Sequence, residues 1–248
     1  MKKSLLMIAG GLLFVTQFAQ AQPTGRSAVI VEAPKKHAFY LGVKAGVDMT
    51  TMTQPEESKL YDGMGTGFSA GLVANARFNR ASENAPAGTG IFGVGLELKY
   101  KLNTVKTIGT NEDGKENANM NLGYFEIPIY AQIFPFYKSD AMNTFYIEVG
   151  PDFAFLTSKS PKTLTVNNPS SDLKNVTYDI KGLKGGDCRI LAGLGYDFPI
   201  KNSDNQTSSL IGLNARYYIG TSSLAKNFSS KMNTFEISLS WKFNLGRL

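Results

Sequence analysis

Hydrophobic and polar residues alternate along most of the chain after residue 38, with the period of two that an extended strand imposes. In each run one face is apolar, and none of these apolar faces contains a charged residue. The pattern predicts an all-β protein with eight strands, near residues 39–48, 68–78, 92–100, 124–133, 145–155, 187–198, 211–219 and 235–245.

The segments between the expected strands alternate in length. Long polar segments follow every odd-numbered strand, at 49–66, 103–121, 157–186 and 221–233. Shorter segments follow the even-numbered strands, at 79–90, 136–143 and 199–208. This arrangement is typical of an eight-stranded antiparallel up-and-down transmembrane β-barrel, with long outer loops at one end and short periplasmic turns at the other.

The polar faces decide between two orientations of such a barrel. A soluble lipocalin-like barrel would carry long solvated side chains on its polar face, whereas a transmembrane barrel turns its apolar faces to lipid. Here the polar faces are rich in glycine, which makes room in a confined lumen. They also carry seven basic and eight acidic residues, which we expect to form a lumenal charge network: Lys44, Asp48, Arg77, Glu97, Lys99, Lys101, Glu126, Glu148, Asp152, Asp187, Arg189, Asp197, Arg216, Glu236 and Lys242.

Aromatic residues near both ends of several apolar faces support the membrane orientation. Phe92 and Tyr100 lie eight positions apart on one face, as do Phe235 and Phe243 on another. About ten residues of a tilted strand cross roughly 25 Å, the height of the apolar band between the aromatic girdles of outer-membrane barrels.

The start of the chain has a different pattern. Lys2 and Lys3 precede an uncharged apolar stretch, and Ala19-Gln20-Ala21 has the form of a signal-peptide cleavage site. A retained membrane helix would need about 20 apolar residues. We therefore expect a signal peptide over residues 1–21, a periplasmic N-terminal tail over 22–37, and a barrel in the cell outer membrane over 38–248.

Four stretches resemble the PorT-like outer-membrane β-barrel family: FYLGVKAG at 39–46, GYFEIPIY at 123–130, FYIEVGP at 145–151 and LAGLGYD at 191–197. The resemblance covers essentially all of residues 38–248 and implies a porin-like outer-membrane barrel. The name-giving member of the family is implicated in assembling a protein-secretion system, so the resemblance also suggests a link to secretion.

Three local features carry further expectations. Pro128 cannot donate a backbone hydrogen bond, so it should mark a bulge or a gap in strand pairing. Cys188 falls on an apolar face and should point toward lipid. Weak alternation at 164–166 and 176–180 predicts a hairpin within the third long connection.

The composition excludes several kinds of chemistry. The chain has 248 residues with one Cys and one His, which excludes intrachain disulfides, thiolate metal clusters and multi-histidine sites. The net charge is +6, and removal of Lys2 and Lys3 leaves 24 basic against 20 acidic residues, too small an excess to indicate nucleic acid. The G-x-G-x-x-G spacing at 88–93 is followed by a strand instead of the helix that a nucleotide site requires. We expect no catalytic residues, no cofactor and no metal.

Three functions remain open at this point: a non-catalytic structural or interaction component, a small passive pore, and a membrane lipase or protease. Eight strands leave an interior just wide enough for side chains, which favours the first. Against the lipase or protease hypothesis, the loops contain no paired nucleophile and base, and the single histidine, His37, lies at the periplasmic end. We expect a monomeric barrel whose partners are outer-membrane lipid, lipopolysaccharide and secretion-system or other envelope proteins. The phosphates of lipopolysaccharide suit the lysine-rich connection at 157–186.

Overall fold

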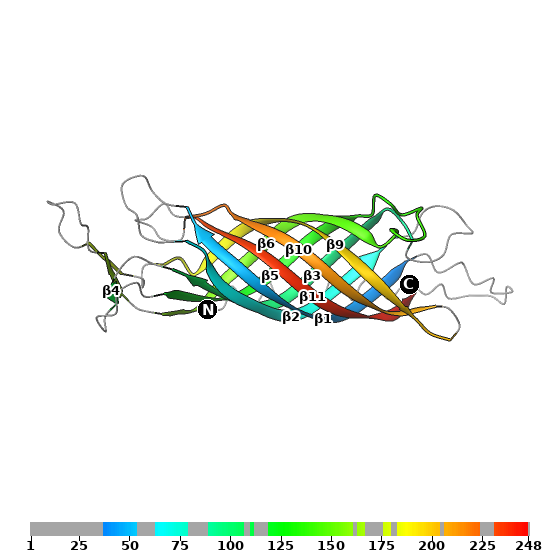
Figure 1. Cartoon of the computed structure of the whole chain (residues 1–248), viewed down its shortest axis with the longest axis horizontal. Helices are drawn as coiled ribbons and strands as arrows, with labels where there is room; N and C mark the ends of the chain where they lie inside the picture. The colour runs from blue at the N-terminus through cyan, green and yellow to red at the C-terminus, as the bar shows by residue number, and fades with distance from the viewer. Residues whose placement is uncertain are drawn as a thin grey trace, which may run out of the picture. The chain divides into compact units, whose positions relative to one another are not determined.

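Eight long antiparallel strands form a closed barrel in the computed structural model (Figure 1). The structure describes residues 37–53, 63–78, 89–106, 110–111, 119–160, 163–166, 176–179, 183–203, 206–223 and 231–247. The barrel strands are β1 (Ala38–Met52), β2 (Gly65–Arg77), β3 (Phe92–Val105), β5 (Met120–Ile133), β6 (Phe145–Ser160), β9 (Gly186–Lys201), β10 (Thr207–Gly220) and β11 (Met232–Arg247). Their order around the barrel, β1-β11-β10-β9-β6-β5-β3-β2, confirms the predicted fold class. The expected signal peptide and residues 22–36 of the expected tail lie outside the described residues.

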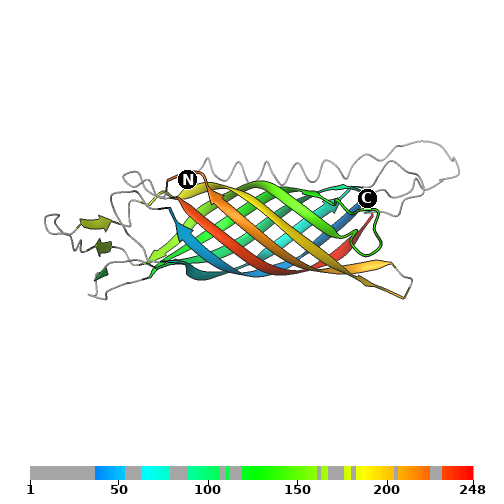
Figure 2. The same ribbon diagram turned by 45° about the horizontal axis from the view of Figure 1, so that its top comes forward.

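Each strand pairs with its neighbours along the chain, and β1 pairs with β11 to close the barrel. Val43 of β1 lies opposite Leu72 of β2 on one side and Trp241 of β11 on the other. The strands run obliquely across the barrel (Figure 2), which is the tilt that closure of a sheet requires. Because both strand edges of β1 are paired, closure leaves no edge of hydrogen-bonding groups for lipid to cover.

The barrel strands extend further than the sequence pattern predicted at the end that carries the long connections. β1 continues to Met52 and β3 to Val105, while β5 begins at Met120 and β11 at Met232. These residues had been expected in loops. They keep the alternation of their strands, so the inward face continues past the last charged residue.

The predicted apolar faces point outward along all eight strands. Most of their large side chains are exposed, from 37% for Phe235 to 62% for Val47, and a few such as Ile127 and Phe145 are half-buried. Cys188 is exposed on the same side, as expected. An apolar surface that covers a whole barrel far exceeds the patches of a few hundred Å² seen on soluble monomers. It is stable only against a hydrocarbon phase.

Small residues of the inward face make room for tyrosines on the neighbouring strand. Gly95 lies opposite Tyr130, and Gly195 lies opposite Tyr146. A Cβ atom on Gly195 would stand 2.6 Å from Cζ of Tyr146, and the ring of Tyr130 occupies the same position over Gly95. The glycines are therefore needed for close approach of the rings across the strands.

Pro128 interrupts the pairing of β5 with β3 without shifting it. Leu96 pairs with Ile129 and Lys99 with Glu126 in one register, and the pairs that Ile127 and Pro128 would make with β3 are missing between them. Pro128 therefore marks a gap, which is one of the two outcomes expected. The bulge of β5 lies elsewhere, between Gly123 and Tyr124 in its pairing with β6.

A second, three-stranded sheet is formed within the connections. Its order is β4-β7-β8, with β4 (Thr110–Asn111) from the β3–β5 connection and β7 (Thr163–Val166) and β8 (Val176–Asp179) from the β6–β9 connection. The antiparallel pairing of β7 with β8 confirms the predicted hairpin, whose tip lies outside the described residues. The addition of β4 was not predicted. Within the described ranges there is no helix of the length and apolarity needed to cross a membrane.

Candidate functional site in the barrel lumen

The charged residues of the inward faces are the candidate site, and the structure places nearly all of them inside the barrel. Asp187 is half-buried, and Ser222 donates its hydroxyl to it. The other fourteen are buried: Lys44, Asp48, Arg77, Glu97, Lys99, Lys101, Glu126, Glu148, Asp152, Arg189, Asp197, Arg216, Glu236 and Lys242. A buried charge is costly unless it is paired, so their contacts determine what the lumen can do.

Arg216 of β10 joins two acidic residues across the lumen. Its guanidinium lies 2.8 Å from Oε1 of Glu97 on β3 and also contacts both carboxylate oxygens of Glu148 on β6. The same group stacks over the ring of Tyr130, 4.6 Å from its centroid. Tyr130 in turn donates its hydroxyl to Glu97 at 2.9 Å. Arginine suits this position because its planar fork holds two carboxylates at once.

Three lysines surround the carboxylate of Glu236 on β11. Lys99 and Lys101 of β3 lie 2.7 Å and 3.1 Å from its Oε2, and Lys44 of β1 lies 3.8 Å from its Oε1. Lys44 also contacts Glu97 at 3.1 Å, so this group is continuous with the Arg216 contacts. Lys101 has a second acidic partner, Asp48 of β1, at 2.9 Å.

Arg189 of β9 binds the remaining acids. Its Nε donates to Asp152 of β6 at 2.9 Å, and its Nη2 contacts Glu126 of β5. Lys99 lies 3.5 Å from Glu126 and connects this group to Glu236. The result is one connected set of five bases and six acids, called here the ionic layer: Lys44, Asp48, Glu97, Lys99, Lys101, Glu126, Glu148, Asp152, Arg189, Arg216 and Glu236.

Four predicted residues lie outside the ionic layer. Lys242 of β11 and Asp197 of β9 pair with each other at 2.7 Å, nearer the short connections. Arg77, at the end of β2, donates its Nε to the carbonyl of Gly90 at 2.9 Å and stacks over Phe134. Asp187 is the fourth. The structure thus separates the predicted set into a central layer and residues toward the two ends.

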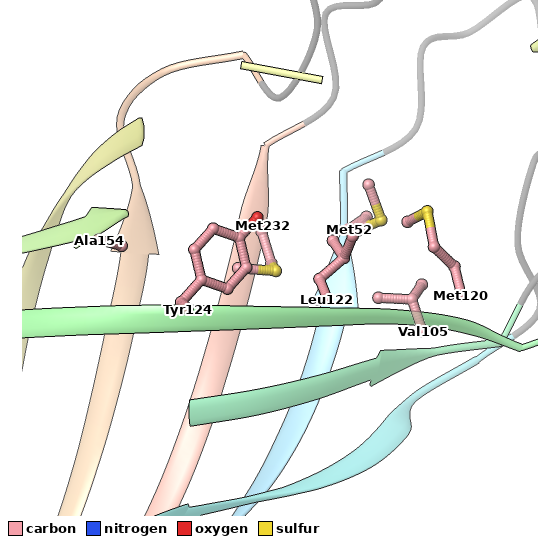
Figure 3. Packing of buried hydrophobic residues seen from close by; sticks show 7 residues of the cluster. All are labelled: Met52, Val105, Met120, Leu122, Tyr124, Ala154 and Met232. Carbon is pink, nitrogen blue, oxygen red and sulfur yellow. The ribbon is translucent and has the colours of Figure 1, made fainter. Parts of the chain in front are cut away.

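Sequence reasoning missed an apolar cluster inside the lumen at the ends of the strands that lead to the long connections. Its members come from β1, β3, β5, β6 and β11 and are called here the apolar cap: Met52, Val105, Met120, Leu122, Tyr124, Ala154 and Met232. Figure 3 shows these side chains gathered where the strands meet the long connections. Val105, Leu122 and Met232 are fully buried. Strand alternation could have predicted them, because residues separated by an even number of positions share a face. Met52 follows Asp48, and Val105 follows Lys101, at such a spacing, so both fall on the inward face.

The arrangement leaves little room for catalysis in the central lumen. Glu97, Glu126 and Glu236 are at most 1% exposed, and each contacts at least two basic side chains. A general acid or base must reach a substrate, and carboxylates held in this way cannot. Within the described ranges, no three His, Cys, Asp or Glu side chains gather as metal ligands would. His37 is exposed before β1 and packs its ring against the edge of Phe78.

Three solved structures are similar to the chain at low sequence identity. Among solved structures, the chain is similar to Neisserial surface protein A (NspA), with 13% identity over 84% of this chain and 97% of that chain and a TM-score of 0.39. It is similar to Ail, the attachment invasion locus protein of Yersinia pestis, with 13% identity, coverage of 82% and 98%, and a TM-score of 0.38. It is also similar to the outer membrane protein OprG from Pseudomonas aeruginosa, with 12% identity, coverage of 84% and 97%, and a TM-score of 0.42.

No curated protein matches the chain significantly. A family profile described as "Outer membrane protein beta-barrel domain" matches residues 18–226, which is far more than half of the chain. With its closed eight-stranded barrel and its apolar outer surface, the protein belongs to this outer membrane β-barrel family.

Proposed function

We propose that the protein is a non-catalytic outer-membrane barrel with a lumen closed to ions, which acts through its connections as a structural or interaction component. The single observation that carries the proposal is the filling of the lumen by the ionic layer and the apolar cap. The proposal includes export by the expected signal peptide over residues 1–21 and, as in PorT-like proteins, a link to protein secretion.

The ionic layer obstructs the middle of the barrel. Its side chains reach across the lumen from seven of the eight strands, and the groups that they contact are on other strands. In a water-filled pore such charges would be screened and solvated separately, whereas in a dry interior they attract one another strongly. An ion entering this layer would have to separate paired groups that are almost fully buried.

The apolar cap obstructs the end near the long connections. An ion that passes an apolar constriction must lose part of its hydration shell, and such constrictions close channels by dewetting. The buried side chains of Val105, Leu122, Tyr124 and Met232 offer few polar groups in exchange. The two layers in series support a closed lumen, so function would depend on surfaces that partners can reach.

Planar-bilayer recording tests the closed lumen. The purified barrel should give no large, reproducible conductance steps. The triple variant Met52→Ser/Met120→Ser/Met232→Ser lets water enter the cap, but the ionic layer in series should keep it free of large steps as well. Reproducible large steps from the unaltered protein would contradict the proposal and favour a small passive pore.

The secretion link needs a separate experiment. Deletion of the protein should lower the amount of exported cargo in the culture medium, and the full chain supplied in trans should restore it. Unchanged secretion after deletion would remove this part of the proposal and leave the closed barrel intact. Lys162, Lys174 and Lys181 of the lysine-rich connection, together with Asp172, lie outside the described residues, so lipopolysaccharide contact there stays an expectation from the sequence.

A further inference from the structure

A polar cavity of about 190 Å³ lies in the barrel near the short connections, on the opposite side of the ionic layer from the apolar cap. The ends of β2, β5 and β9 and the beginnings of β1 and β10 contribute to its wall. Asp140 and Lys201 line it and are exposed, so it communicates with solvent. Its volume is below the 300–1,000 Å³ of sites for drug-sized ligands, and only a molecule of a few heavy atoms would fit.

Arg77 is a buried cation in the wall of this cavity. Its side chain is only 8% exposed, and the hydrogen bond to Gly90 and the contact of 3.7 Å with the centroid of Phe134 hold the guanidinium in place. Its Nη2 is buried without a hydrogen-bond partner. In the part of the chain that the structure describes, no acidic side chain lies within ion-pair distance of it. An unpaired buried donor of this kind favours an acceptor, above all an anionic one.

Two neutral polar side chains of the wall are partly unsatisfied. Asn75, 6% exposed, donates its amide to Tyr130 and Gln132, but its Oδ1 has no hydrogen-bond partner. The hydroxyl oxygen of Thr144, which also lines the cavity, is buried and unpartnered. Besides the guanidinium of Arg77, the wall therefore contains one unsatisfied amide oxygen and one unsatisfied hydroxyl, which suits a ligand with a hydroxyl or amino group beside its charge.

The charges of the wall indicate how much negative charge a ligand could carry. Lys242 is neutralised by Asp197 at 2.7 Å. Exposed Lys201 and exposed Asp140 offset each other in net charge. The charged side chains of the wall, Arg77, Lys201, Lys242, Asp140 and Asp197, therefore sum to one positive charge, which matches a single carboxylate better than a doubly charged phosphate.

We infer that this cavity is a binding site for a small carboxylate that also bears a hydroxyl or amino group, with Arg77 as the anion-binding residue. The site goes beyond the proposed function and does not depend on it, because it lies outside the ionic layer and can be occupied whether or not the lumen conducts.

The test uses the full-length barrel in lipid nanodiscs and three probes: lactate, its uncharged analogue lactamide, and inorganic phosphate, all at constant ionic strength. Binding is followed by NMR from the Nε–Hε signal of Arg77 and the backbone amides of Phe134 and Thr144. Lactate should give saturable shifts, and lactamide should give none that saturate. Arg77→Gln should weaken lactate binding about tenfold or more, because a hydrogen bond to a charged group is lost.

A matched control and a second variant separate binding from folding. Lys138→Gln removes one positive charge from the connection between β5 and β6 without touching the cavity wall, so lactate binding should be unchanged. Asn75→Asp keeps the size of the side chain and adds a negative charge, so it should weaken lactate binding as Arg77→Gln does. Heat-dependent migration on a gel verifies that each variant is a folded barrel.

Several outcomes would overturn the inference. These are shifts that rise linearly with lactate, equal shifts with lactamide, tighter binding of phosphate than of lactate, or unchanged lactate binding in folded Arg77→Gln. If neither cavity variant folds, the comparison of lactate with lactamide and phosphate on the unaltered protein decides alone.

Discussion

Replacement of Arg216 by Met tests whether the lumen is dry and its charges depend on one another. Met keeps much of the length of the side chain but removes the one basic group that contacts Glu148 among the described residues. Glu148 would keep one weak hydrogen bond, from Gln132 at 3.5 Å. Glu97 would be affected less, because Lys44 at 3.1 Å and the hydroxyl of Tyr130 at 2.9 Å still contact it.

The expected loss of unfolding free energy is about 3–5 kcal/mol, the range for removal of one partner from a buried ion pair. Most of it should come from Glu148, which is 1% exposed and would be left charged and nearly unpaired. The double variant Arg216→Met/Glu148→Gln removes that charge as well. It should be less destabilised than the sum of the two single variants by roughly 1–3 kcal/mol.

Urea unfolding of the barrel in lipid vesicles would measure these differences. Trp241 is the single tryptophan and is 51% exposed on the outer face, so its fluorescence reports loss of the lipid environment. The exposed Lys138→Met is a matched control that should stay within about 0.5 kcal/mol of the unaltered protein. A loss below about 1 kcal/mol for Arg216→Met, with additive effects in the double variant, would show that water solvates these groups, and the argument for a closed ionic layer would fail.

Two further substitutions test the outer face and the inner packing, and fractionation tests location. Leu213→Arg, in the middle of β10 and 45% exposed, should cost about 2–4 kcal/mol in vesicles, whereas a barrel in water would tolerate it at almost no cost. Gly195→Ala should cost about 1–3 kcal/mol because its Cβ would meet the ring of Tyr146, while Gly186→Ala on the same strand, with its nearest contact at 3.5 Å, should change stability by less than about 0.5 kcal/mol. The protein should fractionate with the outer membrane and migrate differently on a gel before and after heating, and recovery as a soluble periplasmic protein without detergent would contradict the membrane orientation.

The alternation of residues was sufficient to predict the strands and their two faces. A strand repeats every two residues, so a residue such as Leu213 points to the side opposite Asn214 whatever the neighbouring strands are. The absence of charge from eight successive apolar faces then indicates lipid on one side, and the glycines of the other side indicate a confined space. The order of the strands followed because an up-and-down barrel pairs each strand with the next one along the chain, whether the connection is short or long.

The ends of the strands and the apolar cap could not be recognised one strand at a time. Four members of the cap are single apolar residues next to polar connections, so the sequence pattern assigned them to loops: Met52, Val105, Met120 and Met232. They become a buried cluster only because four different strands end at the same level of a closed barrel. The small sheet is a similar case, since β4 has two residues and is a strand only beside β7.

The partners of the charged residues were decided by the tertiary structure. The sequence alone placed Lys99, Arg189 and Arg216 on inward faces in near balance with acids. It did not show that Lys99 binds Glu236, 137 positions away, or that Arg77 is left without an acidic partner among the described residues. Coulomb attraction and the cost of an unpaired buried charge act over a few ångströms across the lumen, and the closure, tilt and register of the barrel set those distances.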